Sequence, residues 1–183
     1  MQLVIGIPSF GSPDPLFSID SLAPLLYHLG RRHEEIRSVQ LIRDTRTYRH
    51  NARQAIVNAA LGLGADYLLM LDDDQTFTPQ AFDILWAHRD HRVVSGLYFT
   101  RSIPPVPCMF NMGGPEGSLP VLEYPDNELF EVQIVGFGFI LFDVNVFKQI
   151  PPPHFMIGNW LGEDVAFGVK CQAQGIPLLV HTG

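Results

Sequence analysis

Three adjacent carboxylates, Asp72, Asp73 and Asp74, directly follow four large apolar residues at positions 68–71. An apolar run of this kind is typical of a strand that is buried on both faces. Adjacent anions repel one another, so a folded chain needs a positive group beside them. Carboxylate oxygens suit Mg²⁺ or Mn²⁺, which keep coordination positions open for phosphate oxygens. The pattern therefore predicts a divalent ion that carries a phosphorylated ligand, and the alternative is a solvated acidic turn before a helix.

A second acidic pair and a late histidine could take part in the same chemistry. Glu163 and Asp164 follow a glycine and open an expected helix in GEDVAFGVKCQAQG. A carboxylate held in this way can act as a general base, although acidic residues also occur at helix N-termini for structural reasons alone. His181 stands just past the last apolar run, in LLVHTG, where it is either a metal ligand or a structural side chain.

The elements around these residues are expected to alternate between strand and helix in the first half of the chain. Gly30 and Gly64 are expected to end the first two helices, and Thr78 followed by Pro79 to begin the third. This alternation predicts a parallel sheet with helices on both faces. The expected strands are residues 3–7, 39–42, 67–71 and 93–100, and the expected helices are residues 16–29, 52–63 and 79–88.

The second half of the chain has a different pattern. Residues 104–125 are rich in proline and glycine, which favours a loop or an irregular hairpin. A strand is expected at residues 132–143 and a short helix at residues 144–150. A helix at residues 163–174 and a last strand at residues 176–180 complete the chain.

The residues with potential chemistry all follow expected strands. In open α/β sheets, ligands bind beyond the carboxyl ends of the strands. Pro8 and Ser9, the stretch 44–53, the three aspartates and His181 stand in that position. We therefore expect carboxylates, guanidinium groups and an imidazole to meet on one rim of the sheet.

Size and charge limit the classes of partner. The chain has 183 residues, which fits one domain, and 12 basic against 19 acidic residues give a net charge of -7. This excess argues against nucleic acid as a partner, although the basic stretch 43–53 could hold a nucleoside diphosphate. No apolar run approaches the roughly 18 residues that span a bilayer, and the N-terminus is typical of a first strand rather than a signal peptide. We therefore expect a cytoplasmic protein in which Cys108 and Cys171 are free thiols.

Taken together, these segments resemble the GT-A nucleotide-sugar-dependent glycosyltransferases, family 2-like, in a minimal single-domain form. The segments in order are IPSF, RHNAR, ADYLLMLDDDQTFTP with its D-x-D, VGFGFILFDVNVFKQI, GEDVAFGVKCQAQG and the final histidine, and they cover almost the whole chain. The resemblance implies a three-layer α/β/α, Rossmann-like fold with a mostly parallel central sheet. It also implies one domain, 1–183, in which residues 1–100 bind the nucleotide sugar and residues 101–183 bind the acceptor and catalyse transfer.

The resemblance implies a role for each residue on the donor side. Asp74 would bind Mn²⁺ or Mg²⁺, His181 would complete the metal site, and Asp72 would contact the metal directly or through water. The resemblance also implies a set of residues at the nucleotide sugar, and Asp72 belongs to this set as well as to the metal site. The set is Pro8, Ser9, Asp44, Asn51, Arg53, Asp72 and Asp73.

On the acceptor side, the resemblance implies that Asp164 is the general base of an inverting enzyme and that Glu163 binds hydroxyl groups of a saccharide or other acceptor. Trp160 could stack on an acceptor sugar, or it could be a buried loop tryptophan. Gly138 lies in the middle strand, at the implied acceptor pocket. Family members often carry threonine at the position of Phe137, so this side chain is expected to alter the floor of that pocket.

Three other functions fit parts of the pattern. LLMLDDDQT also resembles the D-x-D-x-T segment of haloacid-dehalogenase-like phosphatases, in which Asp72 would be the nucleophile, but that motif normally lies on the first strand. A nucleotidyltransferase would need a G-x-G-x-R loop, which PSFGSPDP lacks. The third alternative is a catalytically dead nucleotide-sugar-binding module. The sequence specifies neither the sugar, the nucleotide and the acceptor nor the oligomeric state.

Overall fold

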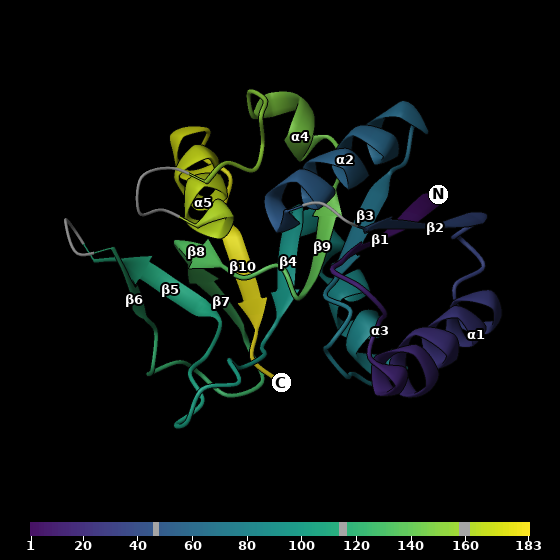
Figure 1. Cartoon of the computed structure of the whole chain (residues 1–183), viewed down its shortest axis with the longest axis horizontal. Coiled ribbons are helices and arrows are strands. Elements are labelled where there is room, and N and C mark those ends of the chain that lie inside the picture. The colour runs from purple at the N-terminus through teal and green to yellow at the C-terminus, as the bar shows by residue number, and fades with distance from the viewer. Residues whose placement is uncertain (46–47, 114–116, 158–161) are drawn as a thin grey trace.

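The computed structural model describes residues 1–45, 48–113, 117–157 and 162–183. Its centre is a seven-stranded sheet with the strand order β2-β1-β3-β9-β4-β10-β7 (Figure 1). β9 is antiparallel to both of its neighbours and β7 is antiparallel to β10, while the other strands run parallel, so the predicted mostly parallel sheet is confirmed. The strands are β1 (Gln2–Ser9), β2 (Ser38–Thr45), β3 (Tyr67–Leu71), β4 (Val93–Gly96), β7 (Leu129–Val132), β9 (Phe139–Asp143) and β10 (Leu178–His181).

Helices cover both faces of this sheet (Figure 1). Side chains alternate between the faces along β3, where Leu68 and Met70 pack on one side and Leu69 and Leu71 on the other. The first side is covered by α2 and α5, and the second by α1 and α3. The helices are α1 (Ala23–Arg32), α2 (Arg49–Gly62), α3 (Pro79–Ala87), α4 (Val146–Gln149) and α5 (Glu163–Ala173), with a π-helical turn η1 (Phe17–Leu22) and a 3₁₀ turn η2 (Arg89–His91). The three-layer architecture is the predicted one.

The turn residues behave in part as predicted. Gly64 adopts a positive φ angle of 67° two residues after the last residue of α2, so this predicted helix end is confirmed. Gly175, with a φ angle of 63°, has the same place after α5. Gly30 does not end its helix, because α1 continues to Arg32 and His33 is the first residue outside it. The second helix begins at Arg49, three residues earlier than predicted, so the last part of the basic stretch, residues 49–53, belongs to this helix.

The predicted strand at residues 132–143 is wrong, because the chain changes sheets within it. β7 ends at Val132, β8 (Ile134–Val135) joins a separate three-stranded sheet, and β9 returns to the centre. The crossing passes Gly136, where a Cβ atom would collide with the hydroxyl of Tyr98. The small sheet has the order β6-β5-β8 and contains the predicted irregular hairpin, formed by β5 (Met109–Met112) and β6 (Ser118–Pro120).

The ends of two other strands also differ from the prediction. β4 stops at Gly96 instead of residue 100, and Phe99 makes only an isolated bridge to Pro107. β10 includes His181 as its last residue. In the part of the chain that the structure describes, we find no helix with the length and apolar character that crossing a membrane requires.

Candidate active site

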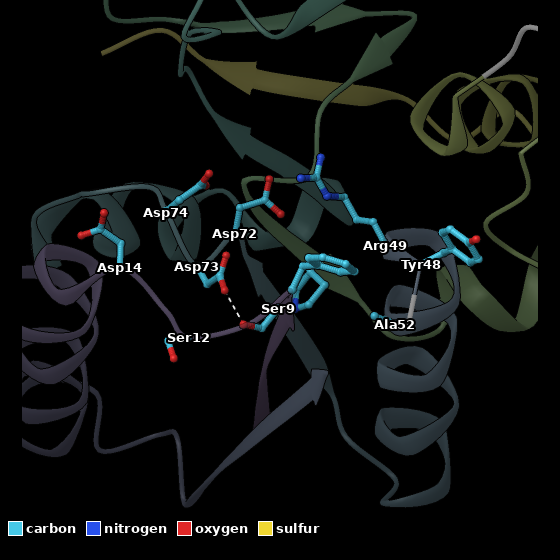
Figure 2. A pocket seen from close by; sticks show the side chains of 11 residues that line it. Ser9, Ser12, Asp14, Tyr48, Arg49, Ala52, Asp72, Asp73 and Asp74 are labelled. Atoms are coloured by element: carbon cyan, nitrogen blue, oxygen red, sulfur yellow. Dashed lines mark hydrogen bonds between the residues drawn. The ribbon is translucent and has the colours of Figure 1, made fainter. Parts of the chain in front are cut away.

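A cavity of about 500 Å³ opens at the carboxyl ends of β1 and β3, and we call it the strand-end cavity (Figure 2). It brings together the predicted groups Pro8, Ser9 and the three aspartates, although they are separated by more than 60 residues in the sequence. The first turn of α2 closes the opposite wall. The lining residues are Pro8, Ser9, Phe10, Ser12, Asp14, Tyr48, Arg49, Ala52, Asp72, Asp73 and Asp74.

Asp73 holds one wall of this cavity in place. Its carboxylate accepts a short hydrogen bond from the Ser9 hydroxyl, as Figure 2 shows. The Ser9 oxygen in turn accepts a hydrogen bond of 2.9 Å from the Arg43 guanidinium. The backbone carbonyl of Asp73 accepts from the N–H of Asp14 at 2.9 Å. Asp73 and Ser9 therefore join the loop after β1 to the loop after β3, so both already have protein partners.

Asp74 is held less firmly than Asp73, by an exposed arginine. One oxygen of its carboxylate lies 3.3 Å from a nitrogen of Arg101, which also donates to the backbone carbonyl of Asp74 at 2.7 Å. The side chain of Arg101 is 69% exposed and that of Asp74 is 42% exposed. Exposed ion pairs contribute little free energy, about 0–1 kcal/mol, so an incoming cation can replace this one.

Asp72 is paired with a buried cation. The Arg53 guanidinium donates to one carboxylate oxygen of Asp72 at 2.9 Å and, through its other terminal nitrogen, makes a short hydrogen bond to Glu163. The side chain of Arg53 is only 4% exposed, and its guanidinium lies over the Phe137 ring, 5.0 Å from the centroid. Arg53 was predicted to contact the nucleotide, but in the structure it joins two carboxylates that come from β3 and α5.

A second cavity of about 300 Å³ lies next to the first, and we call it the Asp164 cavity. Arg49 and Asp72 line both cavities. In Figure 2 the Arg49 guanidinium points to the side of the strand-end cavity where the Asp72 carboxylate lies. The two cavities therefore meet at Asp72. The lining residues of the second cavity are Arg49, Arg53, Asp72, Tyr98, Thr100, Cys108, Phe110, Gly136, Phe137, Glu163 and Asp164.

Asp164 has the electrostatic environment of a base. It lies in the first turn of α5, and one carboxylate oxygen accepts the Val165 N–H at 2.9 Å. Burial raises the pKa of Asp164 above the usual aspartate range, and the neighbouring charge of Glu163 raises it further, while the Val165 hydrogen bond partly opposes them. A carboxylate that is reluctant to be charged accepts a proton more readily than a fully solvated one.

The floor of the Asp164 cavity contains groups that the sequence patterns did not single out. The Tyr98 hydroxyl accepts the Gly138 N–H at 2.9 Å, and burial raises the pKa of this phenol far above its usual value. Burial also raises the pKa of the Cys108 thiol to about 11. Both groups are therefore protonated at neutral pH and can donate hydrogen bonds, but neither is a nucleophile. No sequence signal pointed to Tyr98, because residues 93–100 were all expected to form a strand, whereas β4 ends at Gly96.

His181 does not join the aspartates in this structure. Its ring stacks on His88 at 5.4 Å between centroids and lines a separate cavity with Gln75 and Phe77. In the described residues, the ligand atoms of Asp72, Asp74 and His181 do not form a group within 4.8 Å of one another. The predicted three-residue metal site is therefore not assembled here.

His181 points away from the aspartates because side chains alternate between the two faces along β10. Leu178 and Val180 pack into the layer of α2 and α5. Successive residues of a strand face opposite sides, so His181 faces the layer of α3 instead. Its Nδ1 accepts the backbone N–H of Gly183 at 3.2 Å, which helps to hold this orientation.

Three other predicted residues lie at the margin of the site or beyond it. Asp44 pairs in register with Pro8 but does not line the strand-end cavity. Asn51 is an exposed residue of α2. Gly138 lies behind the Asp164 cavity, where its carbonyl accepts the Asp72 N–H at 2.9 Å. Trp160 lies outside the described residues.

Comparison with known proteins identifies the fold. No protein-family model and no curated protein sequence matches the chain. The solved structure of A197 from STIV matches with a TM-score of 0.64 and 19% identity, over 100% of this chain and 82% of A197. The glycosyltransferase GalNAc-T7, solved with UDP, GalNAc and Mn²⁺, matches with a TM-score of 0.63 and 14% identity. The chain has a GT-A-like fold. It covers 42% of the GalNAc-T7 chain with 99% of its own length, and at these identities the likeness concerns the fold alone.

Proposed function

We propose that this protein is a glycosyltransferase that moves a sugar from a nucleoside-diphosphate sugar to an acceptor hydroxyl with inversion. The observation that carries the proposal is the junction of two cavities at Asp72, with Asp164 in the second of them. A donor in the strand-end cavity and an acceptor in the Asp164 cavity would place the reacting atoms at this junction. The GT-A-like fold supports the same assignment.

The strand-end cavity suits a nucleoside diphosphate. Its volume of about 500 Å³ falls within the range of small-molecule sites. The N-terminus of the 14-residue helix α2 adjoins it, and Arg49 adds a guanidinium, so two features favour a diphosphate. Tyr48, which is 75% exposed, offers an aromatic face for a nucleobase. Ser9 and Asp73 shape the opposite wall.

The aspartates fit a divalent cation on the donor side. Ser9 already holds the carboxylate of Asp73, which leaves Asp72 and Asp74 as the candidate ligands of Mn²⁺ or Mg²⁺. Arg53 contacts one oxygen of Asp72, and the exposed Arg101 can leave Asp74. When bound, such a cation neutralises the negative charge on the departing diphosphate. Both residues would offer carboxylate oxygen atoms, which Mn²⁺ and Mg²⁺ prefer.

Asp164 serves as the base in this proposal. The acceptor oxygen forms a bond to the anomeric carbon while the bond from that carbon to the diphosphate oxygen breaks, and the hydroxyl proton moves to the Asp164 carboxylate. Direct displacement from the opposite face inverts the anomeric configuration. Arg53 occupies one oxygen of Glu163, so the other oxygen can accept a hydrogen bond from an acceptor hydroxyl.

The phosphatase alternative receives less support from the site. The resemblance to those phosphatases implies a lysine near a nucleophilic Asp72, and the described residues that line the two cavities include no lysine. Lys170 donates to the carbonyl of Pro153 and Lys148 to the side chain of Asn145. The Asp72 carboxylate is also held by Arg53, which lowers its reactivity as a nucleophile.

We expect nucleoside diphosphate binding to depend on the cation. UDP or GDP should bind at least about tenfold more tightly with Mn²⁺ than with EDTA, because the ion bridges carboxylates and phosphates. Asp74→Ala should abolish this difference, whereas Asp126→Ala, a change of an exposed aspartate outside both cavities, should preserve it. Isothermal titration calorimetry measures the affinity of each variant with Mn²⁺ and with EDTA. Equal affinity with and without metal, together with an Asp74→Ala variant that behaves like the wild type, contradicts the metal assignment.

The activity itself is tested by incubating the protein with a panel of nucleotide sugars, Mn²⁺ and simple glycoside acceptors. Release of nucleoside diphosphate that depends on the acceptor supports transfer. Metal-dependent binding without any release identifies a catalytically dead binding module. Phosphate release from a phosphomonoester, with no diphosphate release from nucleotide sugars, favours the phosphatase instead.

A further inference from the structure

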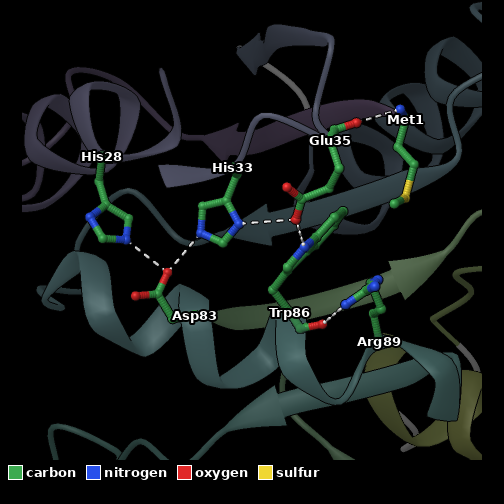
Figure 3. A network of polar contacts seen from close by, with 7 residues as sticks. All are labelled: Met1, His28, His33, Glu35, Asp83, Trp86 and Arg89. Carbon is green, nitrogen blue, oxygen red and sulfur yellow. Dashed lines mark hydrogen bonds and ion pairs between the residues drawn. The ribbon is translucent and has the colours of Figure 1, made fainter. Parts of the chain in front are cut away.

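Away from both cavities, two imidazoles converge on one carboxylate between α1 and α3 (Figure 3). The Nε2 atoms of His28 and His33 each lie 2.7 Å from the same oxygen, Oδ1 of Asp83. His28 belongs to α1, His33 immediately follows that helix, and Asp83 lies on α3. The three ligand atoms lie within 4.8 Å of one another, and no other such group occurs in the part of the chain that the structure describes.

The ring of His33 has a carboxylate on both sides. Its Nδ1 lies 3.4 Å from Oε1 of Glu35, and the same oxygen accepts the Trp86 indole N–H at 2.6 Å. A neutral imidazole has one N–H and one lone pair, so it cannot donate to both Glu35 and Asp83. If Nδ1 donates to Glu35, the lone pair of Nε2 faces the Asp83 oxygen at 2.7 Å, which is repulsive unless a proton or a metal ion lies between them.

We propose that His28, His33 and Asp83 bind a zinc-type transition-metal ion that joins α1 to α3. Two imidazole nitrogens with one carboxylate oxygen are a zinc ligand set, whereas Mg²⁺ prefers oxygen ligands alone. Glu35 supplies the outer hydrogen bond that metal-binding histidines usually make through their second nitrogen, and it directs the Nε2 lone pair of His33 to the ion.

The burial of the three side chains fits such a site. His28 and His33 are 12% and 10% exposed, so the packing of their helices holds them in place, whereas Asp83 is 40% exposed and leaves a route for the ion and for a water as fourth ligand. Ligands at about 2.0–2.2 Å from a tetrahedral ion lie about 3.3 Å apart, so the two nitrogens need to retreat only slightly from the Asp83 oxygen. The three residues are separate from those that line the strand-end cavity and the Asp164 cavity, so the proposed ion would link α1 to α3 without taking part in sugar transfer.

Binding of Zn²⁺ to the tag-free, metal-stripped protein tests this proposal. Calorimetry should show one tight site, and Co²⁺ should give the visible absorption of a tetrahedral nitrogen–oxygen complex. Zn²⁺ at about a hundred times its Kd should raise the Tm by about 5–10 °C, and Mg²⁺ at the same concentration should leave the Tm nearly unchanged.

Variants locate the site. His28→Gln and Asp83→Asn should each weaken Zn²⁺ binding at least about tenfold and remove the shift in Tm. Two control variants should retain both the Zn²⁺ binding and the shift in Tm. His91→Gln changes an exposed histidine outside the group, and Asp74→Ala alters the other candidate cation site. Circular dichroism confirms that each variant is folded before titration, and His28→Gln, which changes one side chain in the middle of α1, serves if Asp83→Asn is unstable. No Zn²⁺ binding by the wild type, or binding that survives both His28→Gln and Asp83→Asn, overturns the proposal.

Discussion

Asp164→Asn is expected to lower the turnover of sugar transfer by about two to four orders of magnitude, because the amide keeps the shape of the side chain but cannot accept the acceptor proton. Nucleoside diphosphate binding should stay unchanged, since Asp164 lines the second cavity and not the strand-end cavity. Steady-state kinetics with a nucleotide sugar and calorimetry with its nucleoside diphosphate measure the two effects separately.

The pH dependence of turnover gives an independent check on the same residue. The base must be deprotonated, and burial raises its pKa, so kcat should fall on the acid side at a pH above the ordinary aspartate range. The free energy of unfolding should change with pH in the opposite direction, because ionisation of Asp164 raises turnover but lowers stability. The folded state binds this proton more tightly than the unfolded state, so the free energy of unfolding falls as the pH rises from the pKa of the unfolded state through the higher pKa of the folded state. Asp164→Asn should therefore be slightly more stable than the wild type at neutral pH.

Glu163→Gln is the matched control, since it changes the neighbouring carboxylate on the same helix. It should raise the KM for the acceptor more than it lowers kcat, because its proposed role is binding rather than proton transfer. Near-normal turnover of Asp164→Asn with an inverted product would show that Asp164 is not the base. A product with retained configuration would remove the need for such a base altogether.

Arg53→Met is expected to lower the free energy of unfolding by about 3–5 kcal/mol, because it leaves Asp72 and Glu163 without their shared buried cation. The guanidinium is almost fully enclosed and pairs with both carboxylates at once. Its substitution should also disturb the junction of the two cavities, where Asp72 lies. Urea unfolding of the purified variant measures the loss.

Two further variants separate the charge effect from lost packing. The triple variant Arg53→Met, Asp72→Asn, Glu163→Gln should recover much of the stability, because no unpaired charge then stays buried. Arg101→Met should change stability by only about 0–1 kcal/mol, since its ion pair with Asp74 is exposed. A cost below about 1 kcal/mol for Arg53→Met, or no recovery in the triple variant, would contradict this account of the junction.

The sequence by itself determined the layered architecture and the position of the chemistry along the chain. The apolar run at residues 68–71 predicted a strand buried on both faces, and β3 is that strand. The order of strands and helices predicted the sheet. Because ligands bind beyond the carboxyl ends of strands, Ser9 and the three aspartates were expected to meet, and they line one cavity. These inferences succeed because they depend on local periodicity and on the general geometry of parallel sheets.

Only the tertiary structure decided which group neutralises which carboxylate. Arg53 meets Glu163 across 110 positions of sequence, and no local pattern records such a pair. The direction of His181 depends on the side of the sheet that its neighbours in β10 occupy. Where the chain changes sheets after Val132, the Tyr98 hydroxyl lies so close to Gly136 that a side chain there would collide with it. The meeting of His28 and His33 with Asp83 likewise requires the packing of α1 on α3. Such contacts are fixed by the three-dimensional fit of distant segments, whereas periodicity reports only the face that each segment buries.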